Sequence, residues 1–182
     1  MNLIEKFFIK KKISSIKLVV LDVDGVLTDG NLYIDSKGNE TKRFNVKDGL
    51  GIKLLQDAKI EIAVISGGKS DSTIQRLKNL EIKYYFFDAK NKLIVLQELK
   101  KNLKLKDSEV LYVGDDLNDL VMKKYVGLFV VPKDAVKHLK KSANIILSKN
   151  GGCGAVRELS EIILEKKDIY KKSIKKGWIG KN

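Results

Sequence analysis

The sequence predicts an α/β fold of the Rossmann-like, doubly wound type, with a mostly parallel sheet, a small β-hairpin flap and no separate cap domain. From Lys17 onward, short β-branched or apolar runs alternate with helix-length amphipathic segments, which is the pattern of βαβ units. The first run, residues 18–21, is wholly apolar and ends in two aspartates. Such a strand is typical of a buried parallel sheet, and open α/β sheets place their sites at the carboxyl ends of these strands.

The remaining elements follow the same alternation. The expected strands, each a short apolar or β-branched run, are 17–22, 60–65, 84–87, 109–113, 126–131 and 144–147. The expected helices, which lie between and after these strands, are 48–58, 70–80, 91–103, 117–125, 133–141 and 154–166.

One segment interrupts the alternation. Residues 31–35 and 40–44 flank Ser36-Lys37-Gly38-Asn39, which predicts a β-hairpin with a glycine-bearing loop. Because the hairpin directly follows the aspartate strand, we expect it to overhang the carboxylates as a flap that shields them from bulk water. It is too short to be a lid domain, and a neighbouring subunit that completed the cover would make the protein a homo-oligomer.

Length and composition indicate one globular domain. The 182 residues are 43% hydrophobic and 32% charged, which is enough for a full core. We divide the chain into an entry segment (1–16), the domain (17–166) and a basic tail (167–182). A single cysteine and a single histidine exclude an internal disulfide and a cysteine- or histidine-rich metal cluster, so any metal is expected to be a hard cation held by oxygen.

The net charge of +13 raises the possibility of nucleic-acid binding. The lysines are spread over nearly every expected helix and no recognition motif is present, so we expect a small anionic substrate and no nucleic acid. No apolar run approaches the length of a membrane span. Apolar residues 7–9 precede basic residues 10–12, the reverse of a secretory signal. We therefore expect an amphipathic entry helix, with a surface anchor as the alternative, and a cytoplasmic protein.

Two aspartates end the first expected strand. A buried strand needs no carboxylate at its exit, so Asp22 and Asp24 indicate a metal ligand, a nucleophile or a proton shuttle. A calcium loop would continue with an oxygen ligand at the next alternate position and a glutamate at the twelfth. Those positions hold Val26 and Tyr33, which excludes an EF-hand.

The next two strand ends carry groups suited to an anion. Ser66 and Gly67 follow residues 60–65 and offer a hydroxyl and backbone N–H groups before a helix, which suits a phosphate, although such residues commonly form only a turn and a cap. Lys92 lies near the start of a helix, where a cation is disfavoured. It therefore serves an anion or is an ordinary solvated lysine.

A fourth strand end is acidic. Asp115, Asp116 and Asp119 follow residues 109–113 within five positions. A helix cap accounts for one of them, and a bound cation is the simplest remedy for the mutual repulsion of all three.

These four segments occur in the order two aspartates, serine, lysine, acidic cluster, each after a different strand. In this order and spacing they resemble the motifs of the haloacid dehalogenase superfamily of aspartate-nucleophile phosphohydrolases, and most closely its 3-deoxy-D-manno-octulosonate 8-phosphate phosphatase family. The segments that carry the closer resemblance are 22–30, 44–52, 91–93, 114–119 and 151–158. The resemblance implies a capless fold, a Mg²⁺ cofactor, a homotetramer and a sugar-acid phosphate substrate used in making the lipopolysaccharide inner core.

The resemblance also implies roles for the acidic residues. Asp22 is the expected nucleophile and a metal ligand. Asp24 is expected to protonate the leaving sugar oxygen and later deprotonate water, and its backbone carbonyl to bind the metal. Asp115 completes the metal ligands, while Asp116 and Asp119 hold them in place or act through water.

Ser66, the Gly67 backbone N–H and Lys92 are expected to bind the transferring phosphoryl oxygens. For the sugar, the resemblance implies contacts from Asn45, Val46, Lys47, Asp48, Gly49, Lys53 and Arg76. Gly68 stands where the family commonly has an arginine, so this position is also expected to influence the substrate. The resemblance further implies that the C-terminal segment at Gly151–Gly154 reaches a neighbouring subunit's site, and the alternative is a turn that leads a helix.

Three functions remain open from the sequence. The first is the phosphatase, acting on an eight-carbon sugar-acid 8-phosphate or on a nine-carbon sialic-type 9-phosphate. The second is a non-catalytic domain with the same fold, against which the intact set Asp22, Asp24, Lys92 and Asp115 argues. The third is a nucleic-acid-binding protein.

Overall fold

The computed structural model describes residues 9 and 11–167. Its centre is a six-stranded sheet in the order β5-β4-β1-β6-β7-β8, in which every neighbouring pair is parallel. The strands are β1 (Leu18–Leu21), β4 (Glu61–Ile65), β5 (Tyr84–Phe86), β6 (Val110–Val113), β7 (Leu128–Val131) and β8 (Ile145–Ile146). This arrangement confirms the predicted doubly wound α/β class.

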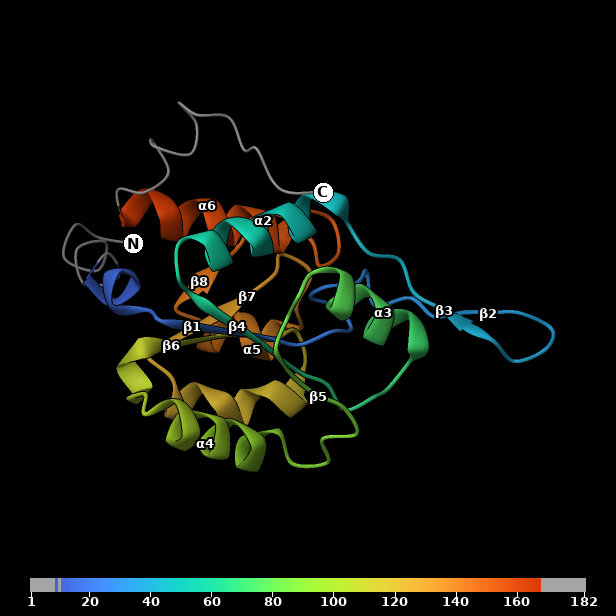
Figure 1. The fold of residues 1–182 in the computed structure, drawn as a ribbon, viewed down its shortest axis with the longest axis horizontal. Coiled ribbons are helices and arrows are strands. Elements are labelled where there is room, and N and C mark those ends of the chain that lie inside the picture. The colour runs from blue at the N-terminus through green and yellow to red at the C-terminus, as the bar shows by residue number, and fades with distance from the viewer. Residues whose placement is uncertain (1–8, 10, 168–182) are drawn as a thin grey trace.

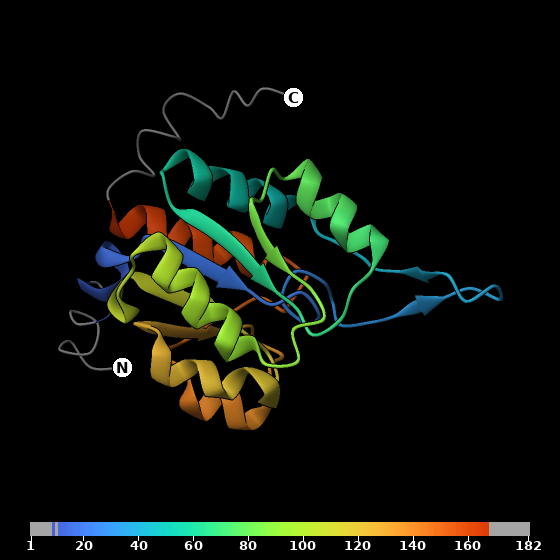
Figure 2. The ribbon, with the colours of Figure 1, turned by 60° about the horizontal axis from the view of Figure 1, so that its bottom comes forward.

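Helices cover both faces of the sheet (Figures 1 and 2). The α-helices are α2 (Val46–Asp57), α3 (Asp71–Asn79), α4 (Lys92–Leu103), α5 (Lys137–Ser142) and α6 (Ala155–Lys166). Helices α2, α3 and α6 supply one apolar layer, and α4, α5 and the 3₁₀ helix η2 (Leu117–Tyr125) supply the other. A short 3₁₀ helix, η1 (Asp107–Glu109), precedes β6.

Strand β1 lies at the centre of both layers. Val19 and Leu21 pack with the α2 and α6 side of the core, and Leu18 and Val20 pack with the α4 side. All four are fully buried, since successive strand residues face opposite sides and helices cover each side. Each side chain of this size stabilises the fold by roughly 1.5–3 kcal/mol through burial.

The strand order reverses beside β1. The chain adds β4 and β5 on one side of β1 and then returns to add β6, β7 and β8 on the other. In the register of β1 with β6, Leu21 pairs with Val113. The residues that follow these two strands therefore leave the sheet side by side at the switch point, where open α/β sheets bind ligands.

Two expected helices differ from the prediction. Residues 117–125 form a 3₁₀ helix: the Asp119 amide donates to the Asp116 carbonyl while its carboxylate accepts from Asp115 N–H, which holds the first turn tight. The expected helix 133–141 begins only at Lys137. The Asp134 carboxylate instead accepts from Gly151 N–H, at 3.0 Å, so it caps a distant loop and not this helix.

The hairpin is present, as β2 (Tyr33–Ile34) paired with β3 (Glu40–Thr41). It projects away from the body of the molecule (Figures 1 and 2), and residues 31–44 do not line the pocket described below. Within one chain the hairpin strands therefore do not close over the pocket, contrary to the expectation, and of the described hairpin residues only Lys42, at the hairpin base, contacts one of its carboxylates, that of Asp24. Leu32, Tyr33 and Ile34 remain exposed on the hairpin, whereas a flap closed over its own chain would bury them.

The ends of the chain are described in part. Residues 9 and 11–15 are helical, as expected for an entry helix, and Ile13 and Ile16 are buried in the core. Of the expected tail 167–182, only Lys167 lies within the described residues; its ammonium donates to the Ser14 carbonyl at 2.8 Å. None of the described helices combines the length and apolarity that crossing a membrane requires.

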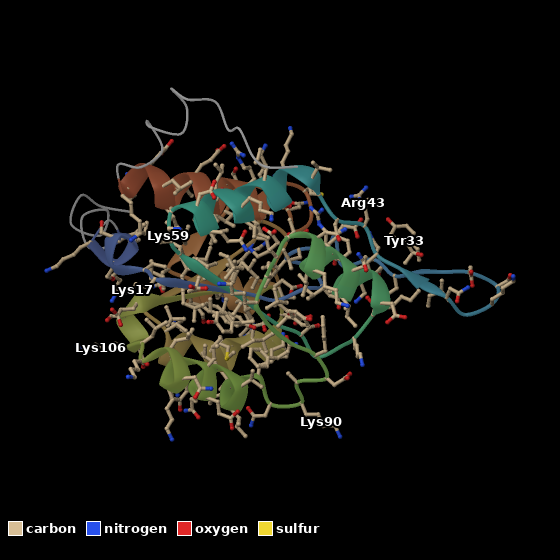
Figure 3. The ribbon with its side chains drawn as sticks, in the orientation of Figure 1. Lys17, Tyr33, Arg43, Lys59, Lys90 and Lys106 are labelled. Atoms are coloured by element: carbon tan, nitrogen blue, oxygen red, sulfur yellow. The ribbon has the colours of Figure 1, made fainter. Side chains whose placement is uncertain are left out.

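Basic residues lie on more than one side of the molecule. Lys17, Lys59 and Lys106 lie along one side, where Lys17 pairs with Glu109, and Lys90 lies at another (Figure 3).

Candidate active site

The four predicted strand ends meet in one pocket of about 590 Å³. It is lined by Asp22, Asp24, Gly25, Gly30, Ser66, Gly67, Gly68, Lys92, Asp115, Asp116 and Asn118. They come from the segments after β1, β4, β5 and β6, because carboxyl ends of parallel strands share one edge of the sheet. The sequence thus predicted the composition of this pocket except for Gly25, Gly30 and Asn118.

Asp22 continues β1 into the site. Its amide donates to the Val113 carbonyl at 3.0 Å, which extends the sheet by one residue. Its carboxylate accepts from Val23 N–H at 2.7 Å and lies 2.7 Å from the Lys92 ammonium. Only 5% of Asp22 is exposed, so one carboxylate is held in a single orientation at the pocket wall.

Lys92 is the first residue of α4, and Asn91 caps that helix by accepting from the Leu93 and Ile94 amides. The Lys92 ammonium lies 2.7 Å from Asp22 Oδ2 and 2.8 Å from Asp119 Oδ1. The two carboxylates explain a lysine at a helix N-terminus, and the ammonium has a third N–H for a ligand. Burial alone would lower the pKa of Lys92, but both carboxylates raise it and the net shift is upward.

Asp119 is fully buried and supports its neighbours. One oxygen accepts from the Tyr112 hydroxyl at 2.6 Å and from Lys92, and the other accepts from Asp115 N–H at 3.0 Å. Carboxylate oxygens of Asp22, Asp115 and Asp119 lie within 4.8 Å of one another. Asp22 and Asp115 line the pocket whereas Asp119 does not, so of these three carboxylates Asp22 and Asp115 are the ones that can hold an ion in the pocket.

The electrostatics of Asp22 and Asp115 favour a cation. Burial, and then the charge of Asp119, raise the pKa of Asp22 to about 7 despite the opposing effect of Lys92. Burial, and then the charges of Asp22, Asp119 and Asp116, raise the pKa of Asp115 to about 7. A cation between them would keep both ionised at neutral pH, and a donor set made only of oxygens suits a hard ion such as Mg²⁺.

Two glycines make room for the carboxylates. Gly25 has φ of +74°, and a Cβ there would lie 2.1 Å from Asp115 Oδ2. A Cβ on Gly114 would lie 2.3 Å from Asp119 Oδ2. Both glycines lie next to aspartates in the sequence, but only the packing shows that Gly25 contacts Asp115 and that Gly114 contacts Asp119.

The segment after β4 forms an open wall. Ser66 is buried, and its hydroxyl accepts from Gly68 N–H at 3.3 Å. A Cβ on Gly67 or Gly68 would meet no atom within 4 Å. Helix α3 follows, with Ser70 as its cap. Ligand atoms can therefore approach the backbone of Gly67 and Gly68 closely.

Most of the predicted sugar contacts lie outside this pocket. Arg76 donates to the Asn45 carbonyl at 3.1 Å, and a Cβ on Gly49 would lie 2.3 Å from Arg76 Nη2. Burial lowers the pKa of Arg76, against the charge of Asp48. These contacts join α2 to α3 within the chain, and a role in substrate binding stays a prediction.

Asp48 joins α2 to α6. Its carboxylate accepts from Gly154 N–H at 3.1 Å and Arg157 N–H at 2.8 Å, which caps α6. Burial raises the pKa of Asp48, although these bonds oppose the shift. Val46 and Lys47 are exposed. Their expected sugar contacts, like that of Asp48, stay predictions.

Lys53 lies in a different hollow, of about 860 Å³. Its ammonium pairs with the exposed Glu81. The hollow includes residues 59–62, which lead into and begin β4, at the edge of the sheet opposite the pocket that contains Asp22. The two hollows share no lining residue, and its sugar contact stays a prediction.

The Gly151–Gly154 segment packs against its own chain. Gly152 N–H donates to the Val26 carbonyl at 3.0 Å, and a Cβ on Gly151 would lie 1.8 Å from the Gly25 carbonyl oxygen. The segment leads directly into α6. Within its own chain the segment is thus a helix-leading turn that supports the loop after Asp22, and a contact with a neighbouring subunit's site stays a prediction.

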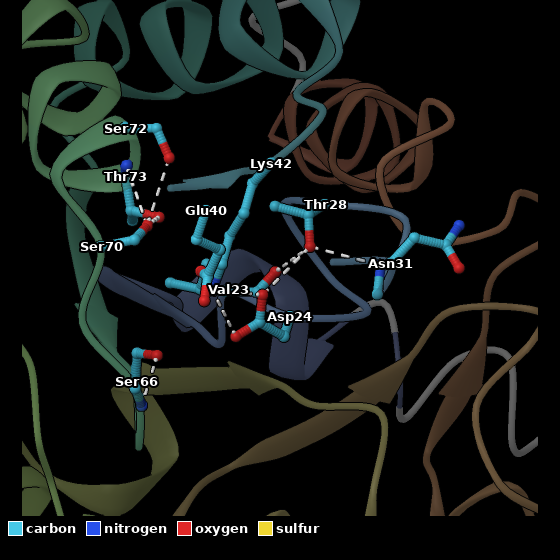
Figure 4. A network of polar contacts seen from close by, with 12 residues as sticks. Val23, Asp24, Thr28, Asn31, Glu40, Lys42, Ser66, Ser70, Ser72 and Thr73 are labelled. Atoms are coloured by element: carbon cyan, nitrogen blue, oxygen red, sulfur yellow. Dashed lines mark hydrogen bonds and ion pairs between the residues drawn. The ribbon is translucent and has the colours of Figure 1, made fainter. Parts of the chain in front are cut away.

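Lys42 is a charged residue that the sequence did not single out. It follows the hairpin, and its ammonium contacts the carboxylate of Asp24 (Figure 4). Nothing in the sequence distinguishes Lys42 from the many other lysines, because its contact with Asp24 depends on the path of the chain from the hairpin back to the domain.

Comparison with known proteins agrees with this geometry. A family model described as haloacid dehalogenase-like hydrolase matches residues 87–159. The 3-deoxy-D-manno-octulosonate 8-phosphate phosphatase of Haemophilus influenzae is 40% identical over 156 residues, which are 86% of this chain and 87% of that protein. The Escherichia coli K12 phosphatase of the same name is 40% identical over 84% of this chain and 81% of its own.

Solved structures give the same result. The Moraxella catarrhalis phosphatase, determined with a magnesium ion, a phosphate ion and a KDO molecule, matches with a TM-score of 0.90 and 36% identity over 93% of this chain and 98% of that chain. A subfamily III A hydrolase from Legionella pneumophila matches with a TM-score of 0.91 and 41% identity over 94% of each chain. This chain therefore belongs to the haloacid dehalogenase-like hydrolases, within the family of the 3-deoxy-D-manno-octulosonate 8-phosphate phosphatases.

Proposed function

We propose that this phosphatase hydrolyses 3-deoxy-D-manno-octulosonate 8-phosphate to the free sugar acid and phosphate, with Mg²⁺ and through an aspartyl-phosphate on Asp22. One observation carries the proposal. The Lys92 ammonium lies 2.7 Å from Asp22 at the wall of a pocket that also contains Asp115. A nucleophilic carboxylate, a cation for the phosphoryl group and a second carboxylate for a metal are thus within reach of one phosphate.

The carboxylates of Asp22 and Asp115 and, by family resemblance, the backbone carbonyl of Asp24 would hold the metal. When bound, Mg²⁺ supplies charge neutralisation between an anionic nucleophile and a phosphate dianion, and orients the two. Asp119 holds Lys92 and the Asp115 backbone through hydrogen bonds. Asp116 lines the pocket beside them.

Asp22 attacks phosphorus while the bond from phosphorus to the sugar oxygen breaks. Lys92, the Ser66 hydroxyl and the Gly67 N–H bind the phosphoryl oxygens. Asp24 gives its proton to the departing sugar oxygen and afterwards takes a proton from the water that cleaves the aspartyl-phosphate. Asp22 and Asp24 thus need different protonation states. Each contacts a lysine ammonium, but their exposure differs: the Asp22 side chain is 7% exposed and the Asp24 side chain is 42% exposed.

The eight-carbon substrate is proposed from the relatives, whose names specify it. Gly68 adds open space to the pocket, which keeps a longer nine-carbon sugar-acid phosphate as a competitor. A phosphate-release assay with both substrates and Mg²⁺, repeated with a chelator, tests the proposal. Preferential release from the eight-carbon ester supports it; preference for the nine-carbon ester changes the substrate, and no release from any ester would favour a non-catalytic domain.

We also propose that the protein works as a cytoplasmic homotetramer. The exposed Leu32, Tyr33 and Ile34 on the projecting hairpin support self-association, because such apolar groups are commonly buried in interfaces. Light scattering on the purified chain measures the assembly directly. A monomer at micromolar concentration would rule this part out.

A further inference from the structure

Lys42 brings the hairpin into contact with the proton-transferring carboxylate. It directly follows β3, and its side chain is 5% exposed. Its Nζ lies 2.8 Å from Asp24 Oδ1 and 2.9 Å from Oδ2 (Figure 4). We infer that Lys42 is a positioning residue, which orients the Asp24 carboxyl group for proton transfer and links that step to the placement of the hairpin. The inference rests on the proposed function.

The contact between Lys42 and Asp24 differs from an ordinary surface ion pair, because its ammonium is buried and lies close to both carboxylate oxygens. A buried ammonium is costly unless it is paired, and removing one partner of such a pair leaves a charge uncompensated. The Asp24 side chain is 42% exposed, so the chain packs it only partly. Its other described contact, with the Thr28 hydroxyl, is a long 3.4 Å. The two short contacts from Lys42 therefore dominate the orientation of Asp24.

Lys42 has one other carboxylate near it. Glu40 Oε1, on the strand β3 that Lys42 follows, lies 3.4 Å from Nζ. This longer contact comes from the hairpin itself, so it can hold the ammonium in place but cannot link the hairpin to the site. The link to the catalytic loop is made by Asp24.

The next residue offers a matched comparison. Arg43 Nε lies 2.9 Å from Asp29 Oδ2, and the arginine side chain is 59% exposed. Arg43 thus ties the same hairpin base to the same loop, but through a carboxylate outside the pocket lining. A substitution of Arg43 loosens the hairpin without removing the partner of Asp24.

The chemistry has two steps that respond differently to Asp24. With an alkyl phosphate, the leaving alkoxide needs the proton from Asp24 in the first step. With p-nitrophenyl phosphate, the leaving phenolate needs little protonation, so only the hydrolysis of the aspartyl-phosphate needs Asp24 as base. A misplaced Asp24 therefore leaves formation of the aspartyl-phosphate from the aryl ester fast. It slows formation of the aspartyl-phosphate from the alkyl ester and its hydrolysis with either ester.

The experiment measures kcat, KM and pre-steady-state nitrophenolate release for wild type, Lys42→Met, Lys42→Arg and Arg43→Met. For Lys42→Met we expect kcat with the sugar-acid phosphate to fall roughly 10- to 100-fold with KM little changed, since general acid catalysis contributes about 10²–10⁴-fold. With the aryl ester we expect a rapid burst and then slow turnover. Lys42→Arg should recover part of the loss, and Arg43→Met should keep the wild-type ratio between the two esters.

The inference would be overturned if Lys42→Met lowered the burst rate and the steady-state rate by the same factor. It would also be overturned if Arg43→Met changed the ratio of activities on the two esters as Lys42→Met does. If Lys42→Met does not fold, as judged by circular dichroism, Lys42→Gln is assayed on the same terms. A wild-type protein inactive on both esters would overturn the proposed function, and this inference with it. An active wild type with proportionate losses would overturn the inference alone.

Discussion

The Lys92 ammonium lies 2.7 Å from Asp22 Oδ2, and both residues are 5% exposed. The pair joins the first turn of α4 to the end of β1, although the two residues are 70 positions apart in the sequence. Since Asp119 holds the same ammonium from its other side, three strand ends are fixed relative to one another before any ligand binds. This preorganisation is the basis of the predictions that follow.

Asp22→Asn is expected to abolish phosphatase turnover and leave the fold intact. The amide has nearly the shape of the carboxylate but is not a nucleophile, and Lys92 keeps Asp119 as a partner. Phosphate release and circular dichroism measure the two effects. Full activity in this variant would refute the aspartyl-phosphate mechanism.

Lys92→Met is expected to reduce both activity and stability. Two buried carboxylates lose their shared cation, and breaking a buried pair commonly costs about 3–5 kcal/mol. Losing one preorganised donor to the phosphoryl group lowers kcat by roughly 10²–10³-fold. Denaturant unfolding and steady-state kinetics provide the readouts.

Lys90→Met is the control for this substitution. Lys90 is exposed two residues earlier, on the loop that leads to α4, and points away from the body (Figure 3). It should behave like wild type in both assays. Equal losses in the two variants would mean that a lysine near this helix start matters only through the general charge of the protein.

The stability of the metal-free protein is expected to fall as pH rises from about 4 to above 7. Asp22 and Asp115 have ordinary values of 3.8 but a pKa of about 7 in the fold. Between these values the folded chain binds more protons than the unfolded chain, so stability decreases with pH. The contribution is fully present below pH 3.8 and is lost as pH passes about 7.

Mg²⁺ should reverse this trend, because it binds the ionised carboxylates. We expect the rise in melting temperature on adding Mg²⁺ to be larger at pH 8 than at pH 5, and smaller at both in Asp115→Asn. Thermal denaturation of chelator-treated protein, with and without added Mg²⁺, measures this rise in melting temperature at each pH. An equal rise at both pH values in wild type would show that the ion does not bind these two carboxylates.

Gly25→Ala is expected to weaken Mg²⁺ binding and activity. Its backbone has φ of +74°, and the new methyl group would displace the Asp115 carboxylate. Gly38→Ala is the matched control, since Gly38 has φ of +82° but open space around its Cβ position. Both variants carry the cost of a positive φ, about 1–2 kcal/mol. Only Gly25→Ala should raise the Mg²⁺ concentration needed for half-maximal activity, and a similar increase in Gly38→Ala would contradict the role of Gly25.

Local patterns in the sequence determined the fold class and the chemistry of the pocket. Apolar runs that end in Asp22, Ser66 and Asp115 predict parallel strands, and the geometry of such strands requires their carboxyl ends to share an edge. The order of the four motifs, through the family resemblance, also predicted that Lys92 belongs to this pocket. These predictions depend on residues close together in the chain and on a topology with few alternatives, which is why they could be made without coordinates.

The tertiary structure decided how the supporting carboxylate acts. The family resemblance already implied that Asp115 binds the metal and that Asp119 supports it. Only the structure shows that Asp119 is fully buried and accepts from the Tyr112 hydroxyl, while Asp115 lines the pocket. Likewise, Asp48 caps α6 and Lys42 reaches Asp24 across 18 positions. Such contacts depend on packing between distant segments, and hydrophobic periodicity contains no information about the rotamer or the partner of a polar side chain.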